Sequence, residues 1–528
     1  MYIHSLPDLD ALSLAEQVAQ MIVVRASGYL FDHQIQYPTW EPPAAKLQYW
    51  LQQLGVGGVI LLGGSAGELA LRCEQLQDWA KIPLLIAADI EEGVGQRFSG
   101  ATWFPPPMAI SSIARKNKSE AQHYAEQMGA ITAQEALAIG INWVLAPVVD
   151  TNNNPENPVI NVRAFGETPA CVIYLATAFI RGAKAYPVLT TAKHFPGHGD
   201  TATDSHLDLP VLPHSLTRLA EIELPPFKAA IAAGVDAVMS AHLLIPSWDA
   251  EQPATLSERI LTQQLRGSLG FEGLIVTDAL VMGAIANRYG ANVAPVLAVE
   301  AGADILLMPV DPEGAIQAVC EAVESGRISQ SRIRASVERI RHAKLKVRSS
   351  RPEARDLMLE LATPAAFTTV DNILRSTQVV HGSLPLRSAK PESCPLRNLI
   401  LVDNLLACDF LGQQSPAIAL PTQLGYTTAL SDCHSPPFHP TPDQTLPTLL
   451  QLFIRGNPFR GSAGVTHTAQ NWFTNLLQTG DLQALVLYGS PYVLEQFLPM
   501  LPPEIPCVFS YGQMPVAQAI ALKTLFNI

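Results

Sequence analysis

The sequence predicts a parallel (β/α)8 barrel of the TIM type followed by a smaller α/β domain. Short apolar runs rich in β-branched residues recur through the first two thirds of the 528-residue chain, and segments with helical spacing separate them. Strands that are hydrophobic throughout are typical of parallel sheets covered by helices. An open, doubly wound sheet is the alternative that this periodicity leaves open.

Eight runs have the length and composition of buried strands. Helical spacing is clearest in five of the segments between them. In either α/β fold the carboxyl ends of the strands meet on one face, so polar residues there should converge. The strand candidates are 21–25, 56–62, 83–89, 142–147, 187–193, 237–242, 273–278 and 303–308, and the helix candidates are 44–54, 66–80, 119–138, 215–233 and 257–269.

A basic helix at 328–347 ends this pattern, so the barrel is predicted to span residues 1–347. Residues 348–395 mix Ser, Pro, Arg and Glu around one amphipathic stretch at 356–362, which is typical of an interdomain connection. A second α/β domain is predicted at 396–528, and no catalytic cluster stands out in it. Its strand candidates are 399–402, 417–420, 449–454, 484–488 and 507–510, and the prolines between 436 and 447 indicate a long loop.

The composition describes a globular protein whose partners are expected to be neutral or small. Hydrophobic residues make up 48% of the chain, charged residues 15%, and the net charge is −13, without a basic stripe for nucleic acid. No apolar run is long enough to span a membrane, and the first ten residues lack the pattern of a secretory signal. The seven cysteines are scattered and never form a CxxC pair. We therefore expect a cytoplasmic protein without nucleic-acid or membrane partners; the sequence does not indicate an oligomeric state.

Polar side chains stand at the ends of five of the predicted strands and in the loops after them, namely Asp89 with Glu91 and Glu92, Asp150, Lys193 with His194, His242 and Asp278. Any one of them could cap the following helix, but together they favour a polar pocket. The densest group is 193–206, which holds three histidines, one lysine and two aspartates. Gly197 and Gly199 are expected to shape this loop into a tight turn.

Two carboxylate–imidazole pairs in this loop could exchange protons with a substrate. Asp204 and His206 are two residues apart, and His198 and Asp200 have the same spacing. A carboxylate that binds one ring nitrogen fixes the imidazole tautomer and leaves the other nitrogen to transfer a proton near neutral pH. The residues alone do not decide between the pairs, one of which could simply brace the loop.

Three further patterns have a chemical and a structural interpretation. Asp278 ends an apolar strand and could be a nucleophile or a helix cap. Arg163, delivered by a loop of turn-forming residues, could bind a ligand oxygen or pair with Asp150 or Glu156. A metal cluster is a weaker hypothesis because its spacing fits no known zinc pattern; its members would be His194, His198, Asp200, Asp204 and His206.

Taken together, these residues resemble glycoside hydrolase family 3, and most of all its β-N-acetylhexosaminidase branch. The resemblance runs from about residue 12 to residue 345. Its most specific part is Lys193-His-Phe-Pro-Gly-His-Gly-Asp-Thr201 followed by Asp204-Ser-His206, and supporting segments are 150–166, 239–242, 253–257, 271–280 and 301–309.

The resemblance implies a retaining, cofactor-independent and metal-independent exo-β-N-acetylglucosaminidase acting on muropeptide or chitin fragments, as in cell-wall recycling. Asp278 matches the family nucleophile, and His206, oriented by Asp204, matches the acid/base, although most retaining glycosidases use two carboxyl groups. The positions that hold the terminal sugar in the family correspond to Asp89, Arg97, Arg163, Lys193 and His194.

The loop after the third strand departs from the family pattern Asp-x-Glu-Gly-Gly-Arg-Val-x-Arg-Phe. Glu92 stands where a glycine is expected and Val94 where an arginine is expected, while Asp89 and Arg97 are kept. This departure keeps open a catalytically inactive sugar-binding protein. A β-glucosidase or β-xylosidase of the same family is the other alternative.

Overall fold

Eight parallel strands form a closed barrel in the computed structural model, which describes residues 6–205, 208–348, 357–386, 395–435, 446–456 and 466–528. The strand order is β7-β6-β5-β4-β3-β2-β1-β8, and a parallel bridge between Val276 of β7 and Ile305, next to β8, closes the ring. The predicted barrel is confirmed. The alternative of an open, doubly wound sheet is wrong, because β7 and β8, which stand at the two ends of the strand order, meet through this bridge.

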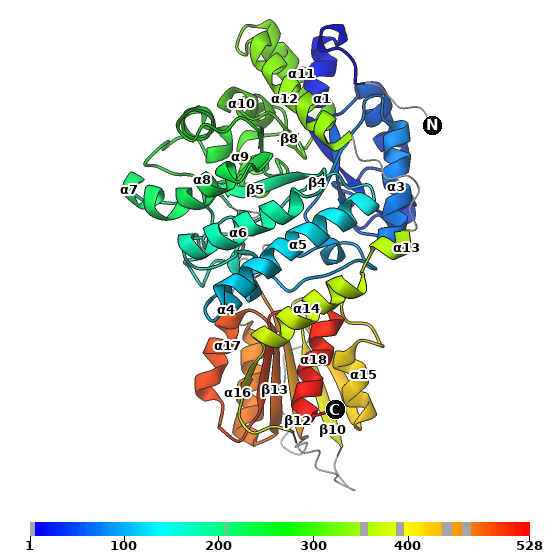
Figure 1. Ribbon diagram of the computed structural model, residues 1–528, viewed down its shortest axis with the longest axis vertical. Coiled ribbons are helices and arrows are strands. Elements are labelled where there is room, and N and C mark those ends of the chain that lie inside the picture. Colours follow the sequence, from blue (N-terminus) through cyan, green and yellow to red (C-terminus); the bar gives the residue numbers. More distant parts are fainter. Residues whose placement is uncertain (1–5, 206–207, 349–356, 387–394, 436–445, 457–465) are drawn as a thin grey trace.

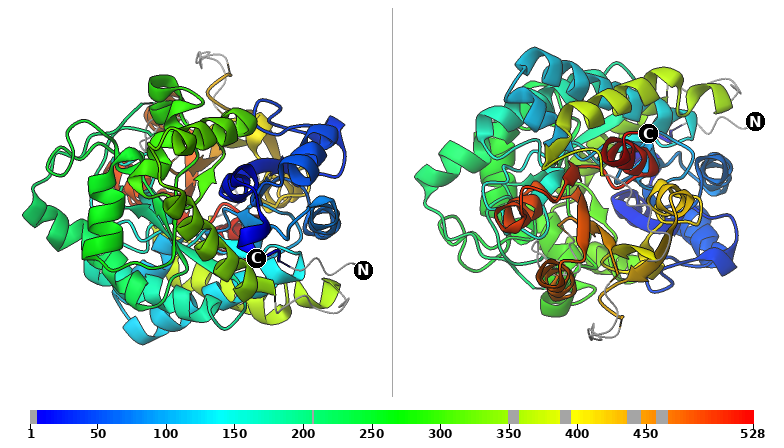
Figure 2. Two further views of the ribbon diagram at one scale, coloured as in Figure 1. Left: turned by 90° about the horizontal axis from the view of Figure 1, so that it is seen from above. Right: turned by 90° about the horizontal axis from the view of Figure 1, so that it is seen from below.

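The eight predicted strand runs all overlap an observed strand, and helices surround the strands (Figure 1; Figure 2). The strands are β1 (Ile22–Ser27), β2 (Gly58–Leu62), β3 (Leu85–Ala88), β4 (Trp143–Val144), β5 (Leu189–Phe195), β6 (Ala237–Ser240), β7 (Leu274–Val276) and β8 (Leu306–Leu307). The helices of this region are α1 (Leu14–Gln20), α2 (Ala44–Tyr49), α3 (Ala66–Trp79), α4 (Pro107–Ala114), α5 (Lys118–Ala138), α6 (Pro169–Ala183), α7 (Leu216–Arg218), α8 (Leu224–Ala232), α9 (Gly283–Tyr289), α10 (Val293–Ala301), α11 (Pro312–Glu324) and α12 (Gln330–Arg348).

The start of α3 follows from its local sequence. Ser65 caps α3 by accepting a hydrogen bond from the backbone of Glu68, whose side chain accepts one from the backbone of Ser65 in return. Three predicted helices include wider, π-type turns, in η3 (Trp50–Leu54), η6 (Leu219–Glu223) and η8 (Arg259–Ser268). Nearly all strand residues are buried, as expected for strands between a filled barrel interior and a ring of helices.

The second domain is a six-stranded sheet with order β11-β10-β12-β13-β14-β9, in which β9 is antiparallel to β14. Four of its five predicted strands are observed. Its strands are β9 (Val379–His381), β10 (Leu396–Leu401), β11 (Tyr426–Ser431), β12 (Thr448–Ile454), β13 (Leu482–Gly489) and β14 (Cys507–Ser510), and its helices are α15 (Pro416–Gln423), α16 (His467–Thr479), α17 (Pro491–Phe497) and α18 (Pro515–Phe526).

The fifth predicted strand, 417–420, is wrong because these residues lie in α15. Ser415 precedes this helix and Pro416 opens it, a combination that favours a helix start, whereas a four-residue apolar run alone fits either structure. The sequence analysis also missed two edge strands, β9 and β11, which have exposed or partly exposed residues and no clear apolar pattern. Most of the predicted proline-rich loop, 436–445, lies outside the described residues.

The segment 348–395 contains regular structure as well as a connection. It includes α13 (Leu357–Glu360), α14 (Pro364–Thr377) and β9. Helix α14 contacts α4 and α5 of the barrel and α18 of the second domain, and Figure 1 shows it beside the junction of the two. The side chain of Thr369 on α14 donates a hydrogen bond of 2.8 Å to Gln127 on α5.

The residues at the carboxyl ends of the barrel strands face the second domain. One pocket is lined both by residues after β3, β5 and β7 and by residues of the second domain, including Phe410 and Arg455. No helix within the described ranges is long and apolar enough to cross a membrane.

Candidate active site

The pocket between the two domains has a volume of about 460 Å³. Six of the eight residues that the family resemblance assigns to the site line it, namely Asp89, Arg97, Arg163, Lys193, His194 and Asp278. Asp204 is buried, and its neighbour Ser205 lines the pocket. His206 lies outside the described residues.

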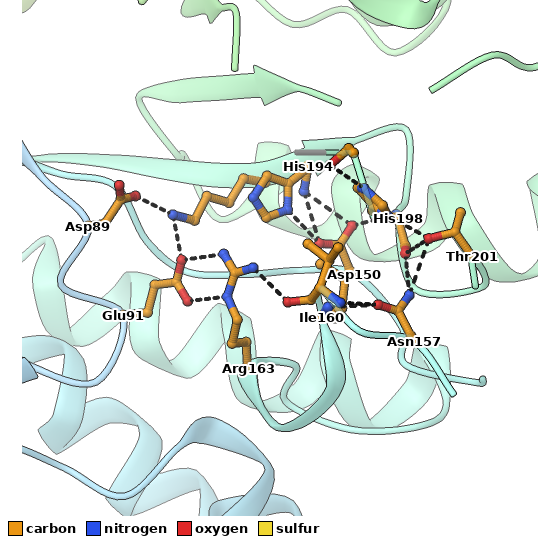
Figure 3. A network of polar contacts seen from close by, with 12 residues as sticks. Asp89, Glu91, Asp150, Asn157, Ile160, Arg163, His194, His198 and Thr201 are labelled. Carbon is orange, nitrogen blue, oxygen red and sulfur yellow. Dashed lines mark hydrogen bonds and ion pairs between the residues drawn. The ribbon is translucent and has the colours of Figure 1, made fainter. Parts of the chain in front are cut away.

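Lys193 and Arg163 are held by two carboxylates that follow β3 (Figure 3). Lys193 Nζ lies 2.7 Å from Asp89 Oδ1 and 2.6 Å from Glu91 Oε1. Arg163 donates two hydrogen bonds, of 2.8 and 2.7 Å, to the two oxygens of Glu91, and a third of 2.8 Å to the carbonyl of Val159. Arg163 therefore pairs with Glu91 and not with Asp150 or Glu156, the partners considered from the sequence.

Burial and charge oppose each other in this network. Burial alone would raise the pKa of Glu91, but Arg163 and Lys193 hold that pKa well below its usual range. Burial alone would lower the pKa of Lys193, but Asp89 and Glu91 raise it above its usual value. Glu91, Arg163 and Lys193 are therefore all ionised at neutral pH. Glu91 is one of the polar residues noted at this strand end from the sequence, but the sequence analysis gave it no role in the site.

A second buried carboxylate, Asp150, organises the loop after β5. His194 Nδ1 lies 2.8 Å from Asp150 Oδ2, and the backbone amides of His194 and His198 donate to the same carboxylate at 3.1 and 2.8 Å. A carboxylate at Nδ1 favours a proton on that nitrogen and so fixes the imidazole orientation. The His194 ring is thereby held in one orientation at the pocket wall. Asp150 is one of the loop residues noted from the sequence, but its partner could not be read there.

His198 is a buried, neutral histidine. Burial lowers the pKa of His198 to about 4. Its ring nitrogens lie 2.8 Å from Thr201 Oγ1 and 3.1 Å from Ser205 Oγ. The alternative dyad of His198 with Asp200 is therefore wrong: Asp200 instead pairs with His214 at 2.8 Å and Arg218 at 3.0 Å.

The loop turns where the sequence places glycines. A Cβ atom on Gly199 would lie 1.7 Å from the carbonyl oxygen of Thr151, so only glycine fits this approach. The close contact brings the His198 loop against the loop that leads to Arg163, and Asn157 donates a hydrogen bond of 2.7 Å to the carbonyl of His198. The two loops thus support each other.

Asp278 lies two residues beyond β7, at the pocket wall. Its Oδ1 accepts a hydrogen bond of 2.8 Å from the amide of Ala279. The carbonyl of Ala279 lies 3.1 Å from His242 Nε2, and Thr255 Oγ1 lies 2.8 Å from His242 Nδ1. A partly exposed carboxylate on a rigid strand end can attack an electrophilic carbon.

The residues proposed for a metal cluster have separate partners where the structure describes them, as His194, His198 and Asp200 show above. Among the described residues, Asp200, His214 and Glu223 place possible ligand atoms within 4.8 Å of one another. Arg218 bridges Asp200 and Glu223 at 3.0 and 2.7 Å, so these groups form an ion network. The pocket itself offers oxygen and nitrogen groups for hydrogen bonds.

The altered loop after β3 has a partner in the second domain. Glu92 is fully buried and forms two contacts with Arg455, of 2.6 and 3.2 Å, while Val94 is buried in the barrel core. Arg97 Nε donates to the carbonyl of Asp89 at 3.0 Å, and the Arg97 side chain lines the pocket. The sequence analysis missed Arg455, for which the only signal was a cation directly after a strand of the second domain.

Family comparisons agree with both domains. The pattern described as the glycosyl hydrolase family 3 N-terminal domain matches residues 13–343. The chain belongs to glycoside hydrolase family 3. Residues 390–527 match the bacterial C-terminal domain of the same family, so the second domain also has a family counterpart.

Individual relatives of this family 3 chain carry hexosaminidase names. Beta-hexosaminidase A of Pseudoalteromonas piscicida is 34% identical over 394 residues, which are 66% of this chain and 65% of that protein. A beta-hexosaminidase of Thiobacillus denitrificans is 37% identical over 262 residues, 49% of this chain and 72% of that protein. The chain thus spans slightly less than two thirds of the first relative and more of the second.

Solved structures match over both domains. A family 3 β-N-acetylglucosaminidase from Paenibacillus sp. str. FPU-7 superposes with a TM-score of 0.78 at 29% identity, covering 98% of this chain and 97% of that one. The β-glucoside phosphorylase BglX superposes with a TM-score of 0.81 at 24% identity, covering 98% of this chain and 93% of that one, and shows the shared fold alone.

Proposed function

We propose that this chain is a retaining exo-β-N-acetylglucosaminidase that removes terminal β-linked N-acetylglucosamine from muropeptide or chitin fragments. The observation that carries the proposal is one pocket lined by Asp89, Arg97, Arg163, Lys193, His194 and Asp278. These are the residues that the family resemblance assigns to the sugar and the nucleophile. The hexosaminidase names of the relatives support the amino-sugar substrate.

The charges of the pocket suit a neutral sugar. Two cations, the buried Lys193 and the largely buried Arg163, are matched by two carboxylates, Asp89 and Glu91. An anionic ligand would have to displace one of these carboxylates from a buried ion pair, which is costly. Hydroxyl groups can instead accept from the cations and donate to Asp89, whose side chain is 36% exposed.

The proposed reaction has two steps. Asp278 attacks the anomeric carbon and forms a covalent glycosyl-enzyme, while His206 protonates the leaving oxygen. His206 then takes a proton from the water that releases the sugar from Asp278. Asp204 orients His206, and Asp89, Arg97, Arg163, Lys193 and His194 hold the terminal ring. No metal takes part, so a chelator should leave the rate unchanged.

The first test compares release of nitrophenol from an aryl β-N-acetylglucosaminide by the wild type and Asp278→Ala. Loss of the nucleophile should lower kcat by at least about a thousandfold, equivalent to about 4 kcal/mol in activation free energy. Asp10→Ala, which removes an exposed carboxylate that pairs with Arg334, is the matched control and should keep full activity. The first sugar released should be the β-anomer, as seen by proton NMR.

The same assay distinguishes the alternatives. If the wild type hydrolyses an aryl β-glucoside or β-xyloside faster than the aryl β-N-acetylglucosaminide, the protein is a β-glucosidase or β-xylosidase, and the proposed amino-sugar substrate is wrong. Sugar binding without turnover of any of the three glycosides would leave a sugar-binding protein and end the enzyme proposal.

A further inference from the structure

Glu92 is a buried carboxylate whose main partner belongs to the other domain. Its side chain is fully buried, and Arg455 donates to both of its oxygens, from Nη2 at 2.6 Å and from Nη1 at 3.2 Å. Trp103 Nε1 donates a third hydrogen bond at 3.1 Å. A buried carboxylate is strongly unfavourable without a cation, so Glu92 depends on Arg455, which directly follows β12.

Glu92 lies in the middle of the loop that carries two sugar-facing residues. The loop runs from Asp89 to Phe98, and both Asp89 and Arg97 line the pocket. Within it, the amide of Glu92 donates to the side chain of Gln96 at 2.9 Å, and the carbonyl of Glu92 accepts from the amide of Phe104 at 2.8 Å. A shift of Glu92 would therefore be transmitted to the backbone that positions Asp89 and Arg97.

The residue after Arg455 contacts the other sugar-facing loop. A Cβ atom on Gly456 would lie 2.8 Å from Asn161 Cβ and 3.1 Å from the carbonyl oxygen of Pro158, so the two backbones approach closely. Asn161 also lies 3.2 Å from Ser490 Oγ of the second domain. Asn161, which makes these contacts, is two residues before Arg163 in the chain. The two residues after β12, Arg455 and Gly456, thus touch both barrel loops that carry Arg97 and Arg163.

The contact between Glu92 and Arg455 offers a physical explanation for the departure from the family pattern at positions 92 and 94. The family pattern has a glycine and a nearby arginine in the loop, whereas this chain has a glutamate there and takes its cation from the second domain. Bidentate arginine–carboxylate pairs fix orientation as well as distance. The pair is therefore suited to hold the loop in one conformation.

We propose that Arg455 is a positioning residue that acts through Glu92, so that the second domain fixes the loop carrying Asp89 and Arg97. Its consequence for sugar affinity rests on the proposed function, whereas the ordering of the loop does not. Because Arg455 also lines the pocket, its main rival role is direct contact with substrate, and the experiment must separate the two.

A double-mutant cycle makes this separation. Glu92→Gln, Arg455→Gln and the double variant are compared with the wild type for KM and kcat on the aryl N-acetylglucosaminide. Each single change should raise KM about tenfold with a smaller change in kcat, and the double variant should be no worse than either single one. Arg455→Lys should recover part of the loss. Multiplication of the two single effects in the double variant, or unchanged KM in the single variants, would overturn the proposal.

Hydrogen exchange read by mass spectrometry tests the ordering of the loop without any activity. Arg455→Gln should speed amide exchange in peptides covering 89–104, although it lies more than 350 residues away in the chain. Thr369→Val, which removes the hydrogen bond between α14 of the connecting segment and α5 of the barrel, is the matched control and should leave these peptides unchanged. Unchanged exchange in Arg455→Gln would refute the positioning role. If the wild type has no glycosidase activity but Arg455→Gln still speeds exchange in peptides 89–104, the proposed function fails and the positioning role of Arg455 stands.

Discussion

Replacement of Glu91 by glutamine should destabilise the barrel strongly, because this carboxylate neutralises two buried cations. Its side chain is 3% exposed and accepts from Arg163 twice, at 2.7 and 2.8 Å, and from Lys193 at 2.6 Å. Glutamine keeps the shape but loses the charge and turns an N–H group toward these donors. Removal of one partner from a buried pair costs about 3–5 kcal/mol in the free energy of unfolding.

Urea unfolding followed by circular dichroism measures this loss. With an m-value of about 3 kcal/mol/M, the midpoint of the barrel transition should fall by about 1 M or more. Glu313→Gln is the matched control because it breaks an exposed pair with Lys46, and it should change stability by less than about 1 kcal/mol. A loss at Glu91 no larger than that of the control would refute the argument from burial.

The pH dependence supplies an independent check on the same residue. The pKa of Glu91 lies well below its usual value in the folded protein, so the unfolded state binds the proton more readily. The stability advantage of the wild type over Glu91→Gln should therefore be complete above about pH 5 and should shrink as the pH falls below the unfolded carboxyl pKa of about 4.3. An advantage that grows on acidification would show that charge is not its origin.

Two further predictions concern buried groups at the two ends of the barrel. His198 has a pKa of about 4 against an ordinary 6.5, so the free energy of unfolding should fall by about 3 kcal/mol between pH 6.5 and pH 4. Urea titrations at several pH values should show a smaller slope for His198→Gln, and equal slopes would contradict this. Asp304, before β8 and away from the pocket, is fully buried and binds Arg266 at 2.7 Å and Arg339 at 3.1 Å. Asp304→Asn should cost about 3 kcal/mol or more of stability while KM of the folded enzyme stays constant, and a raised KM would contradict a purely structural role.

The sequence was most informative where one local property decides the structure. Runs such as 187–193 are apolar and β-branched because a barrel strand is buried on both sides, and this composition is visible without any tertiary contact. The same rule failed at 417–420, where four apolar residues fit a strand or a helix and the Ser-Pro start decided for α15. Edge strands such as β11 carry no such pattern because they are only half buried.

The barrel, the second α/β domain and most of the polar residues of the pocket could be predicted from the amino-acid sequence, because the strand ends of a parallel barrel necessarily share one face. Which of these residues pair with one another became visible in the folded chain. In the structure Arg163 pairs with Glu91, and His194 pairs with Asp150. Asp200 pairs with Arg218 and not with His198. The fold also brings Arg455 to Glu92 across the domain boundary. Charge pairing depends on distances of a few ångströms between residues far apart in the chain, and no local pattern encodes such distances.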